Sequence, residues 1–139
     1  MANNNIDYIT VATTGNATDF GDLTTAWYRS GGMSDETRGI ISGGYSHPGG
    51  ATSDEEMEYI TIATTGNAID FGDLQVGVRW PGAASNGTQG IIAGGNSSTD
   101  ANPVYQNVIN KCTIQTAANC TDFGDMATAR SKHGGLSGA

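Results

Sequence analysis

The chain has 139 residues, which is enough for one domain with a buried core. Its 21 glycines and its 14 % of charged residues are typical of short strands joined by tight turns, and they exclude a mainly helical protein. The net charge of -8, with only six basic residues, excludes a nucleic-acid-binding protein. No apolar stretch reaches the roughly 20 residues that cross a bilayer, so we expect no membrane insertion, and no signal peptide is recognisable at the start.

The first element in chain order recurs three times. Residues 7–23 read DYITVATTGNATDFGDL, residues 58–74 read EYITIATTGNAIDFGDL, and residues 110–126 read NKCTIQTAANCTDFGDM. The repeated phenylalanines Phe20, Phe71 and Phe123 lie 51 and then 52 residues apart. A fixed period of this size marks a repeat architecture. The sequence therefore predicts one domain, 1–139, made of units at about 6–56, 57–107 and 108–139, the last of them incomplete.

Within each copy, alternation of β-branched residues predicts a β-hairpin. In the first copy Ile9 and Val11 share one strand face, residues 13–16 supply the turn, and Phe20 lies on the returning strand. This places Ile9 roughly opposite Phe20. The equivalent pairing in the third copy sets Cys112 opposite Phe123.

A second element follows each of the first two hairpins. Residues 37–44 read TRGIISGG and residues 88–95 read TQGIIAGG, which predicts a buried strand ended by two glycines. Arg29, Arg79 and Arg130 follow the hairpins at nearly equal intervals. We expect a fourth strand to begin near each arginine, and we expect these arginines to tie neighbouring units together rather than to line a channel.

This order of elements resembles the kelch repeat of β-propellers. Gly43-Gly44, the strand 59–62, Phe71 and Arg79 follow one another as they do in a kelch blade, with Phe in the place of the usual Trp. The phrase IATTGNAxDFGDL also resembles kelch-like repeats of structural and tail-fibre proteins of marine bacteriophages. The resemblance implies a virion component, located in the virion or in the host cytoplasm during assembly.

Three units cannot close a propeller, which needs about four to eight blades. The resemblance therefore implies blades that are closed by oligomerisation or that form part of a larger propeller. A β-trefoil is the alternative fold, since it closes with three four-stranded units of this length.

The cysteines and the repeated aspartates favour structural roles. In the expected register Cys112 and Cys120 lie too far apart for a disulfide, so we expect buried free thiols. The paired aspartates of each Asp-Phe-Gly-Asp are expected to cap turns, although they could each hold a cation. No zinc, nucleotide or nucleophile motif occurs, and we expect no metal site, no catalytic residue and no cofactor.

Two segments between matching strands, 45–56 and 96–106, differ between the units. Variable loops on a repeat scaffold often carry binding functions. Aromatic, amide and acidic side chains on these loops suit contact with carbohydrate or protein. The candidate binding residues are Tyr45, His47, Asn96, Asp100 and Tyr105.

The leading functional hypothesis is a non-enzymatic structural and binding module that contacts a host surface glycan or a protein partner through its repeat loops. Expected partners are further copies of the chain or other virion proteins. A self-assembling scaffold without ligand binding is one alternative. A metal-dependent kelch-type enzyme is a second alternative. The chain does not offer matched histidine positions for such a site, since His47 and His133 are not equivalent in the repeat.

Overall fold

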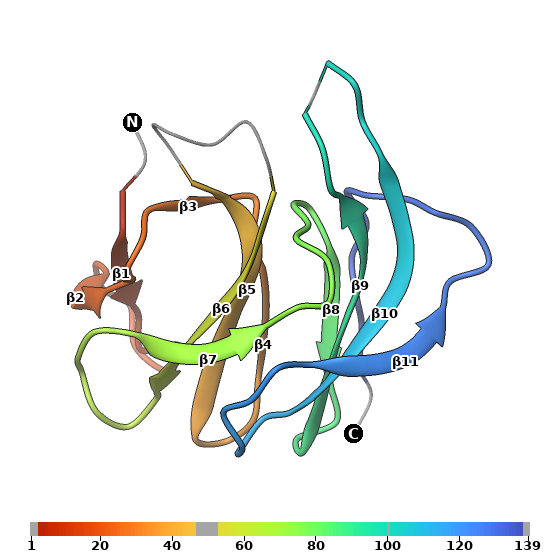
Figure 1. Cartoon of the computed structure of the whole chain (residues 1–139). Coiled ribbons are helices and arrows are strands. Elements are labelled where there is room, and N and C mark those ends of the chain that lie inside the picture. Colours follow the sequence, from red (N-terminus) through yellow and green to blue (C-terminus); the bar gives the residue numbers. More distant parts are fainter. Residues whose placement is uncertain (1–2, 47–52, 100, 138–139) are drawn as a thin grey trace.

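The computed structural model describes residues 3–46, 53–99 and 101–137. These residues form strands and no helix (Figure 1), which confirms the all-β class expected from the composition. The strands are β1 (Asn5–Tyr8), β2 (Thr18–Asp22), β3 (Trp27–Tyr28), β4 (Gly31–Ser34), β5 (Arg38–Ser46), β6 (Asp54–Thr61), β7 (Ile69–Asp73), β8 (Gly82–Ser85), β9 (Gln89–Asn96), β10 (Tyr105–Thr113) and β11 (Thr121–Asp125).

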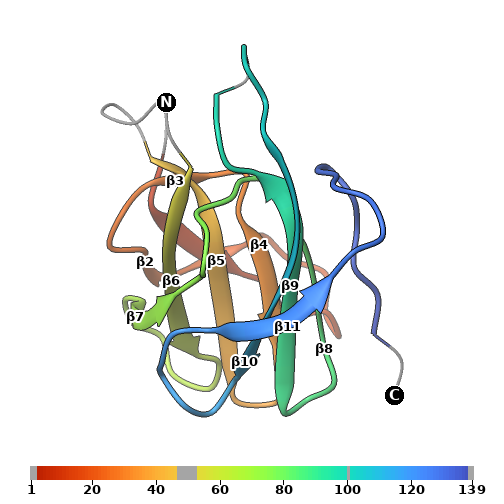
Figure 2. The ribbon, with the colours of Figure 1, turned by 45° about the vertical axis from the view of Figure 1, so that its right-hand side comes forward.

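Two antiparallel sheets account for most of the structure. Strands β4 to β7 pair in chain order to form the first sheet, and β8 to β11 pair in chain order to form the second. The short β3 pairs with the end of β5, while β1 and β2 form a separate hairpin. The sheets lie side by side in both views (Figures 1 and 2), and Ser85 in β8 donates a 2.5 Å hydrogen bond to the carbonyl of Ser34 in β4.

Each of these two sheets therefore takes its first two strands from one sequence unit and its hairpin from the next, and we refer to β4–β7 and β8–β11 as the two complete units of the structure. The described residues form three separate, open sheets, which neither close into a propeller nor form a trefoil barrel. After β11 the chain runs back along β8 (Figure 2), where a Cβ atom added to Gly135 would overlap the backbone of Ala83. The segment 134–137 thus lies beside β8 as β8 lies beside β4.

One apolar core joins the two complete units. The first sheet contributes Met57 and Phe71, and the second contributes Ile92 and Ile114, all of them buried. Because side chains alternate along a strand, one isoleucine of each Ile-Ile pair faces this core and its neighbour faces the other side. Phe71 therefore acts as an aromatic anchor between these units.

The glycine pairs do not end their strands, contrary to the prediction. Strand β5 continues through Gly43 to Ser46, with a register shift against β6 between Ser42 and Gly44. The backbone of Gly43 is left-handed, with φ of 58°, and a Cβ atom there would lie 2.5 Å from the carbonyl oxygen of Val78. Glycine is needed here for a bulge and a close backbone approach rather than for a strand end.

The register of the repeated hairpin also differs from the prediction. Asp7 lies opposite Asp19, with a β-bulge after Ile6, so Ile9 lies beyond the paired strand and not opposite Phe20. The reason is that the chain turns earlier than residues 13–16. The tight turn is closed by a 3.2 Å hydrogen bond from the amide of Thr13 to the carbonyl of Thr10. The same turn recurs at Thr61–Thr64 and Thr113–Thr116.

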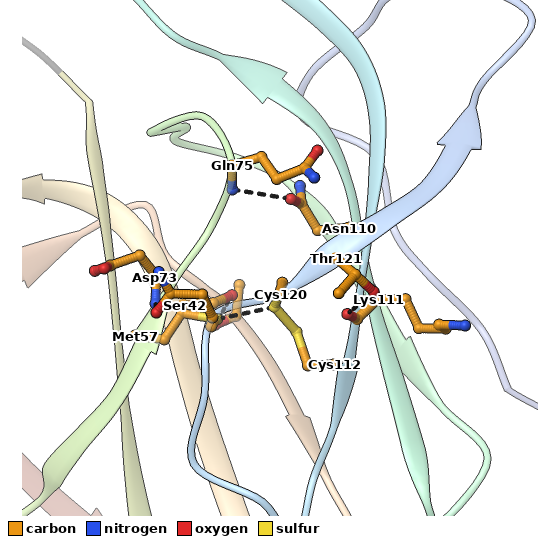
Figure 3. Close-up of a disulfide and its surroundings, with 11 residues drawn as sticks. Ser42, Met57, Asp73, Gln75, Asn110, Lys111, Cys112, Cys120 and Thr121 are labelled. Atoms are coloured by element: carbon orange, nitrogen blue, oxygen red, sulfur yellow. Dashed lines mark hydrogen bonds between the residues drawn. A yellow bond between two sulfur atoms is a disulfide. The ribbon is translucent and has the colours of Figure 1, made fainter.

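This register brings the two cysteines together, so the prediction of free thiols was wrong. Lys111 lies opposite Thr121, which makes Cys112 and Cys120 the next facing pair. Their Cα atoms are 4.7 Å apart and their sulfur atoms form a disulfide (Figure 3). Both residues are buried, as expected, and the Cys120 sulfur lies 3.6 Å from that of Met57 in the first sheet. The disulfide therefore belongs to the core between the units.

Candidate ligand-binding site

One backbone position recurs in the left-handed region at the end of the sheets where the glycine pairs lie. Arg29, Trp80 and Lys132 have φ values of 66°, 54° and 59°, and they are spaced by 51 and 52 residues, like the repeated phenylalanines. The amide of Trp80 donates to the carbonyl of Arg29 at 2.7 Å, and the amide of Lys132 donates to the carbonyl of Trp80 at 3.0 Å. The three equivalent residues thus form a hydrogen-bonded row across neighbouring units.

This row corrects the alignment of the repeated arginines. Trp80, not Arg79, is the structural equivalent of Arg29, and the third equivalent is Lys132 rather than Arg130. The three arginines therefore occupy successive positions in the repeat instead of one shared position. A tie between units exists at this place: Arg29 contacts the Trp80 ring of the next unit, and Arg79 lies 5.6 Å from the ring of Tyr45 in β5.

Cationic groups gather around two aromatic rings here. The guanidinium carbon of Arg29 lies 4.1 Å from the centre of the Trp80 ring, and the Lys132 Nζ lies 4.2 Å from it. Arg79 contributes a third cation, 5.7 Å from the Trp80 ring and 5.6 Å from the Tyr45 ring. An aromatic face attracts a cation through its negative quadrupole, which holds these side chains close despite their like charges.

A cavity of about 370 Å³ opens beside this cluster. Its walls come from the segments before β4 and β8, the end of β9, the start of β10 and the segment that follows β11. The lining residues are Arg29, Trp80, Asn96, Pro103, Tyr105, Ser131 and Lys132. Tyr105 is 51 % exposed, so its ring is available at the rim. The cavity therefore combines cationic groups with aromatic surface.

Acidic side chains of β6 and β7 lie close to one another. Burial raises the pKa of Glu56 in β6, and the nearby carboxylates of Glu58 and Asp54 raise it further. In contrast, four of the six basic residues of the chain belong to the segments around the cavity, namely Arg29, Arg79, Arg130 and Lys132. An acidic protein thus carries most of its positive charge at one end of its sheets.

The structure brings together three of the five binding residues expected from the sequence. Tyr105 and Asn96 line the cavity, and Tyr45 lies within cation–π distance of Arg29 and Arg79. Tyr45 and Asn96 belong to strands β5 and β9 rather than to loops. The other two candidates, His47 and Asp100, lie outside the described residues.

Asn96 shapes the cavity rather than facing it as an exposed loop residue. It is buried, and its Oδ1 accepts 3.0 Å hydrogen bonds from the amides of Ser98 and Val104. Its Nδ2 donates to the carbonyl of Thr99 at 3.4 Å. A buried amide with all these partners fixes the course of the chain between β9 and β10. Tyr105, which follows directly, is thereby held at the rim.

Sequence reasoning missed Trp80 and Lys132. The signal that could have found them is the 52-residue spacing between the second and third units, which aligns Lys132 with Trp80 and Gly134-Gly135 with the start of β8. Alignment on the arginines, which are conspicuous in a chain with so few basic residues, concealed this equivalence.

The first aspartate of the second and third copies accepts a hydrogen bond from a nearby backbone amide, as expected, but it does so within strands β7 and β11 rather than at a turn. Asp70 accepts a 3.0 Å hydrogen bond from the amide of Gly72, and Asp122 accepts a 2.9 Å hydrogen bond from that of Gly124. Over residues 3–46, 53–99 and 101–137, no group of three or more His, Cys, Asp or Glu side chains is arranged to hold a metal ion.

None of the described segments forms a helix long and apolar enough to span a bilayer. Comparison of the chain with models of known protein families finds no match, and a search of curated proteins also finds none.

Proposed function

We propose that the chain is a non-enzymatic structural and binding module, of the kind found in phage virions and tail fibres, and that it binds an acidic host-surface glycan. The observation that carries this proposal is the cavity around Trp80, where Arg29 and Lys132 both lie over the ring of Trp80 in a protein of net charge -8. Kelch-like blades, which the repeat resembles, are the scaffold that we propose for it.

The chemistry of the cavity suits a sugar that carries a carboxylate or sulfate. The exposed Lys132 ammonium would contact the anionic group by a charge-assisted hydrogen bond, which is stronger than a neutral one. The exposed Tyr105 ring offers an apolar face for the C–H groups of a sugar and a hydroxyl for hydrogen bonding.

Backbone strain at the site supports a binding role. A non-glycine residue in the left-handed region costs about 1–2 kcal/mol, and such residues cluster at ligand-binding sites. Here Trp80 and Lys132 both carry this cost, and the hydrogen bonds along the row hold them in place. The cation and the rings are thus positioned before a ligand arrives, which reduces the entropy lost on binding.

The disulfide supports an extracellular or virion-surface setting. Disulfides persist in oxidising environments, which include virion and cell surfaces. The pair Cys112–Cys120 is buried in the core between units, where it would keep the scaffold rigid outside a cell.

The proposal is tested by calorimetric titration of the chain with a polyuronate, a sulfated polysaccharide and neutral dextran. We expect binding to the charged polymers, weakening as salt rises because ionic contacts are screened. Replacement Lys132→Gln should weaken binding by about tenfold, as expected for the loss of one ionic contact worth about 1.4 kcal/mol. Lys111→Gln, which removes the same charge from another part of the chain, should leave binding unchanged. Equal binding of dextran, or equal loss in both variants, would contradict the proposal.

A further inference from the structure

Neighbouring units are joined by a contact that occurs twice with the same atoms. The side-chain oxygen of Asn67 accepts a 3.1 Å hydrogen bond from the amide of Asp22, and that of Asn119 accepts one of the same length from the amide of Asp73. The residue after each asparagine then donates its amide to the carbonyl of the same aspartate. These bonds are Ala68 to Asp22 at 2.8 Å and Cys120 to Asp73 at 2.9 Å.

A second polar contact accompanies the first in both places. The carboxylate of Glu58 accepts a 3.1 Å hydrogen bond from the amide of Thr24, which lies two residues after Asp22. The side-chain oxygen of Asn110 accepts one of 3.1 Å from the amide of Gln75, which lies two residues after Asp73. Each hairpin therefore presents two side-chain acceptors and one amide donor to the Asp-Phe-Gly-Asp strand of the unit before it.

The first hairpin carries the same groups on a face that is exposed. Repeat spacing makes Asp7 equivalent to Glu58, Asn16 to Asn67 and Ala17 to Ala68, and all three residues of the first hairpin are exposed. We call this surface the head; its apolar members are Ile9 and Val11. Val11 is 91 % exposed, whereas its equivalent in the third unit, Ile114, is fully buried against the preceding unit.

The last Asp-Phe-Gly-Asp strand offers the matching groups, also exposed. Phe123 is 60 % exposed, whereas its equivalent Phe71 is 2 % exposed beneath the next hairpin. A Cβ atom added to Gly72 would lie 2.6 Å from the carbonyl carbon of Ala118, but nothing lies within 4 Å of one added to Gly124. Asp125 and Ala127 are exposed too. We call this surface, which borders a groove of about 290 Å³ between Ile91 and Phe123, the tail.

We propose that the head of one copy of this chain docks on the tail of a second copy, repeating the contact that already joins the units within the chain. Asn16 Oδ1 of one copy accepts from the amide of Asp125 of the other, and Ala17 donates to the carbonyl of the same aspartate. Asp7 accepts from the amide of Ala127. Ile9 and Val11 cover Phe123, so that burial of apolar surface drives the association.

The proposed interface is heterologous, because head and tail are different surfaces. Such interfaces give closed rings when the rotation between copies closes and open filaments when it does not. A two-fold interface is self-complementary instead, with one patch meeting itself. Head-to-tail and two-fold association are therefore distinguished by mixing a chain that has a damaged head with a chain that has a damaged tail. Only head-to-tail association predicts that this mixture regains the interface.

Sedimentation velocity over a range of concentrations tests the proposal on the intact chain. We expect species heavier than the 14.3 kDa chain, and we expect both Asn16→Arg in the head and Phe123→Asp in the tail to weaken association by roughly tenfold or more. Asn102→Arg and Val104→Asp introduce the same charged residues at exposed positions away from both surfaces, and these variants should associate normally. Circular dichroism verifies that each variant is folded.

Mixing the two damaged chains gives the decisive result. The Asn16→Arg chain keeps its tail and the Phe123→Asp chain keeps its head. At a concentration at which neither chain dimerises alone, an equimolar mixture should therefore form a one-to-one dimer. A wild-type chain that stays monomeric at all concentrations would overturn the proposal. Association that survives in both variants, or variants that fail to complement each other, would overturn it as well.

Discussion

Arg29 and Trp80 are equivalent residues of neighbouring units that contact each other twice. The amide of Trp80 donates a 2.7 Å hydrogen bond to the carbonyl of Arg29, and the Arg29 guanidinium lies 4.1 Å from the centre of the Trp80 ring. Backbone and side chain thus join the units at the same point. Because Lys132 repeats the position, this row places cations and an aromatic ring at one cavity, which is the basis of the proposed glycan site.

Substitution of Trp80 should separate the backbone role of this residue from its ring. Its φ of 54° suits glycine, so Trp80→Gly should be more stable to urea than Trp80→Ala by about 1 kcal/mol. Both variants lack the ring and should lose glycan binding to a similar extent. Equal stability of the alanine and glycine variants would contradict the left-handed backbone conformation of Trp80.

Removal of the disulfide should destabilise the chain without disturbing its core. The first two units carry Ile and Ala at the two cysteine positions, so the pair Cys112→Ile and Cys120→Ala keeps a side-chain combination that the repeat already packs. For so short a loop, the chain-entropy model gives a loss of roughly 2–3 kcal/mol in the free energy of unfolding. Urea denaturation measures this loss. A reductant should destabilise the native chain and leave the double variant unaffected.

Two glycines of equivalent sequence should respond differently to alanine. Gly72→Ala places a Cβ atom 2.6 Å from the backbone of Ala118, in addition to a left-handed φ of 125°. Gly124→Ala meets the same backbone cost at φ of 133° but has open space around it. We therefore expect the Gly72 variant to have the lower melting temperature in the monomer. Equal melting temperatures would contradict the packing of the third hairpin on the first complete unit.

The stability of the chain should fall in acid through Asp35. Desolvation acts to raise the pKa of this carboxyl, but hydrogen bonds from Gln115 and from the Arg38 and Thr37 amides outweigh it and hold the pKa at about 2. A folded-state pKa below the usual 3.8 means that the stabilisation is present above about pH 4 and is lost as the pH falls towards 2. Asp35→Asn should flatten the stability profile in this range. An unchanged profile would contradict the contact between Asp35 and Gln115.

Burial of Glu56 predicts the opposite dependence of stability on pH. Its pKa is raised, first by burial and then by the neighbouring carboxylates of Glu58 and Asp54. The charged form is therefore disfavoured in the folded chain, and stability is lost as the pH rises above 4.5 through the higher folded-state pKa. Glu56→Gln should raise the melting temperature at pH 7 and should have little effect at pH 4. A lower melting temperature at pH 7 would contradict this assignment.

The features that depend on the repeat period could be predicted from the sequence. Copies of DFGD and of the Gly-Ile-Ile element led to an all-β chain. Hairpin register could not be predicted, because one β-bulge after Ile6 and a turn that begins near Thr10 shift every facing pair. The same shift hid the disulfide, since the pairing of Cys112 with Cys120 depends on register alone.

The candidate site was predicted only in part, for a related reason. Tyr45, Asn96 and Tyr105 were found because they lie in variable segments, where binding residues often occur. Trp80 and Lys132 were missed because their role depends on a left-handed backbone and on contacts between units, which a single sequence does not display.

Hydrogen exchange of the native chain with and without an acidic polysaccharide tests the proposed site most directly. The account predicts slower amide exchange at 79–81, 96–99 and 130–133, around Trp80, with no change at the head and tail surfaces, which lie on other segments. Protection confined to other segments, or no protection at saturating polysaccharide, would contradict it.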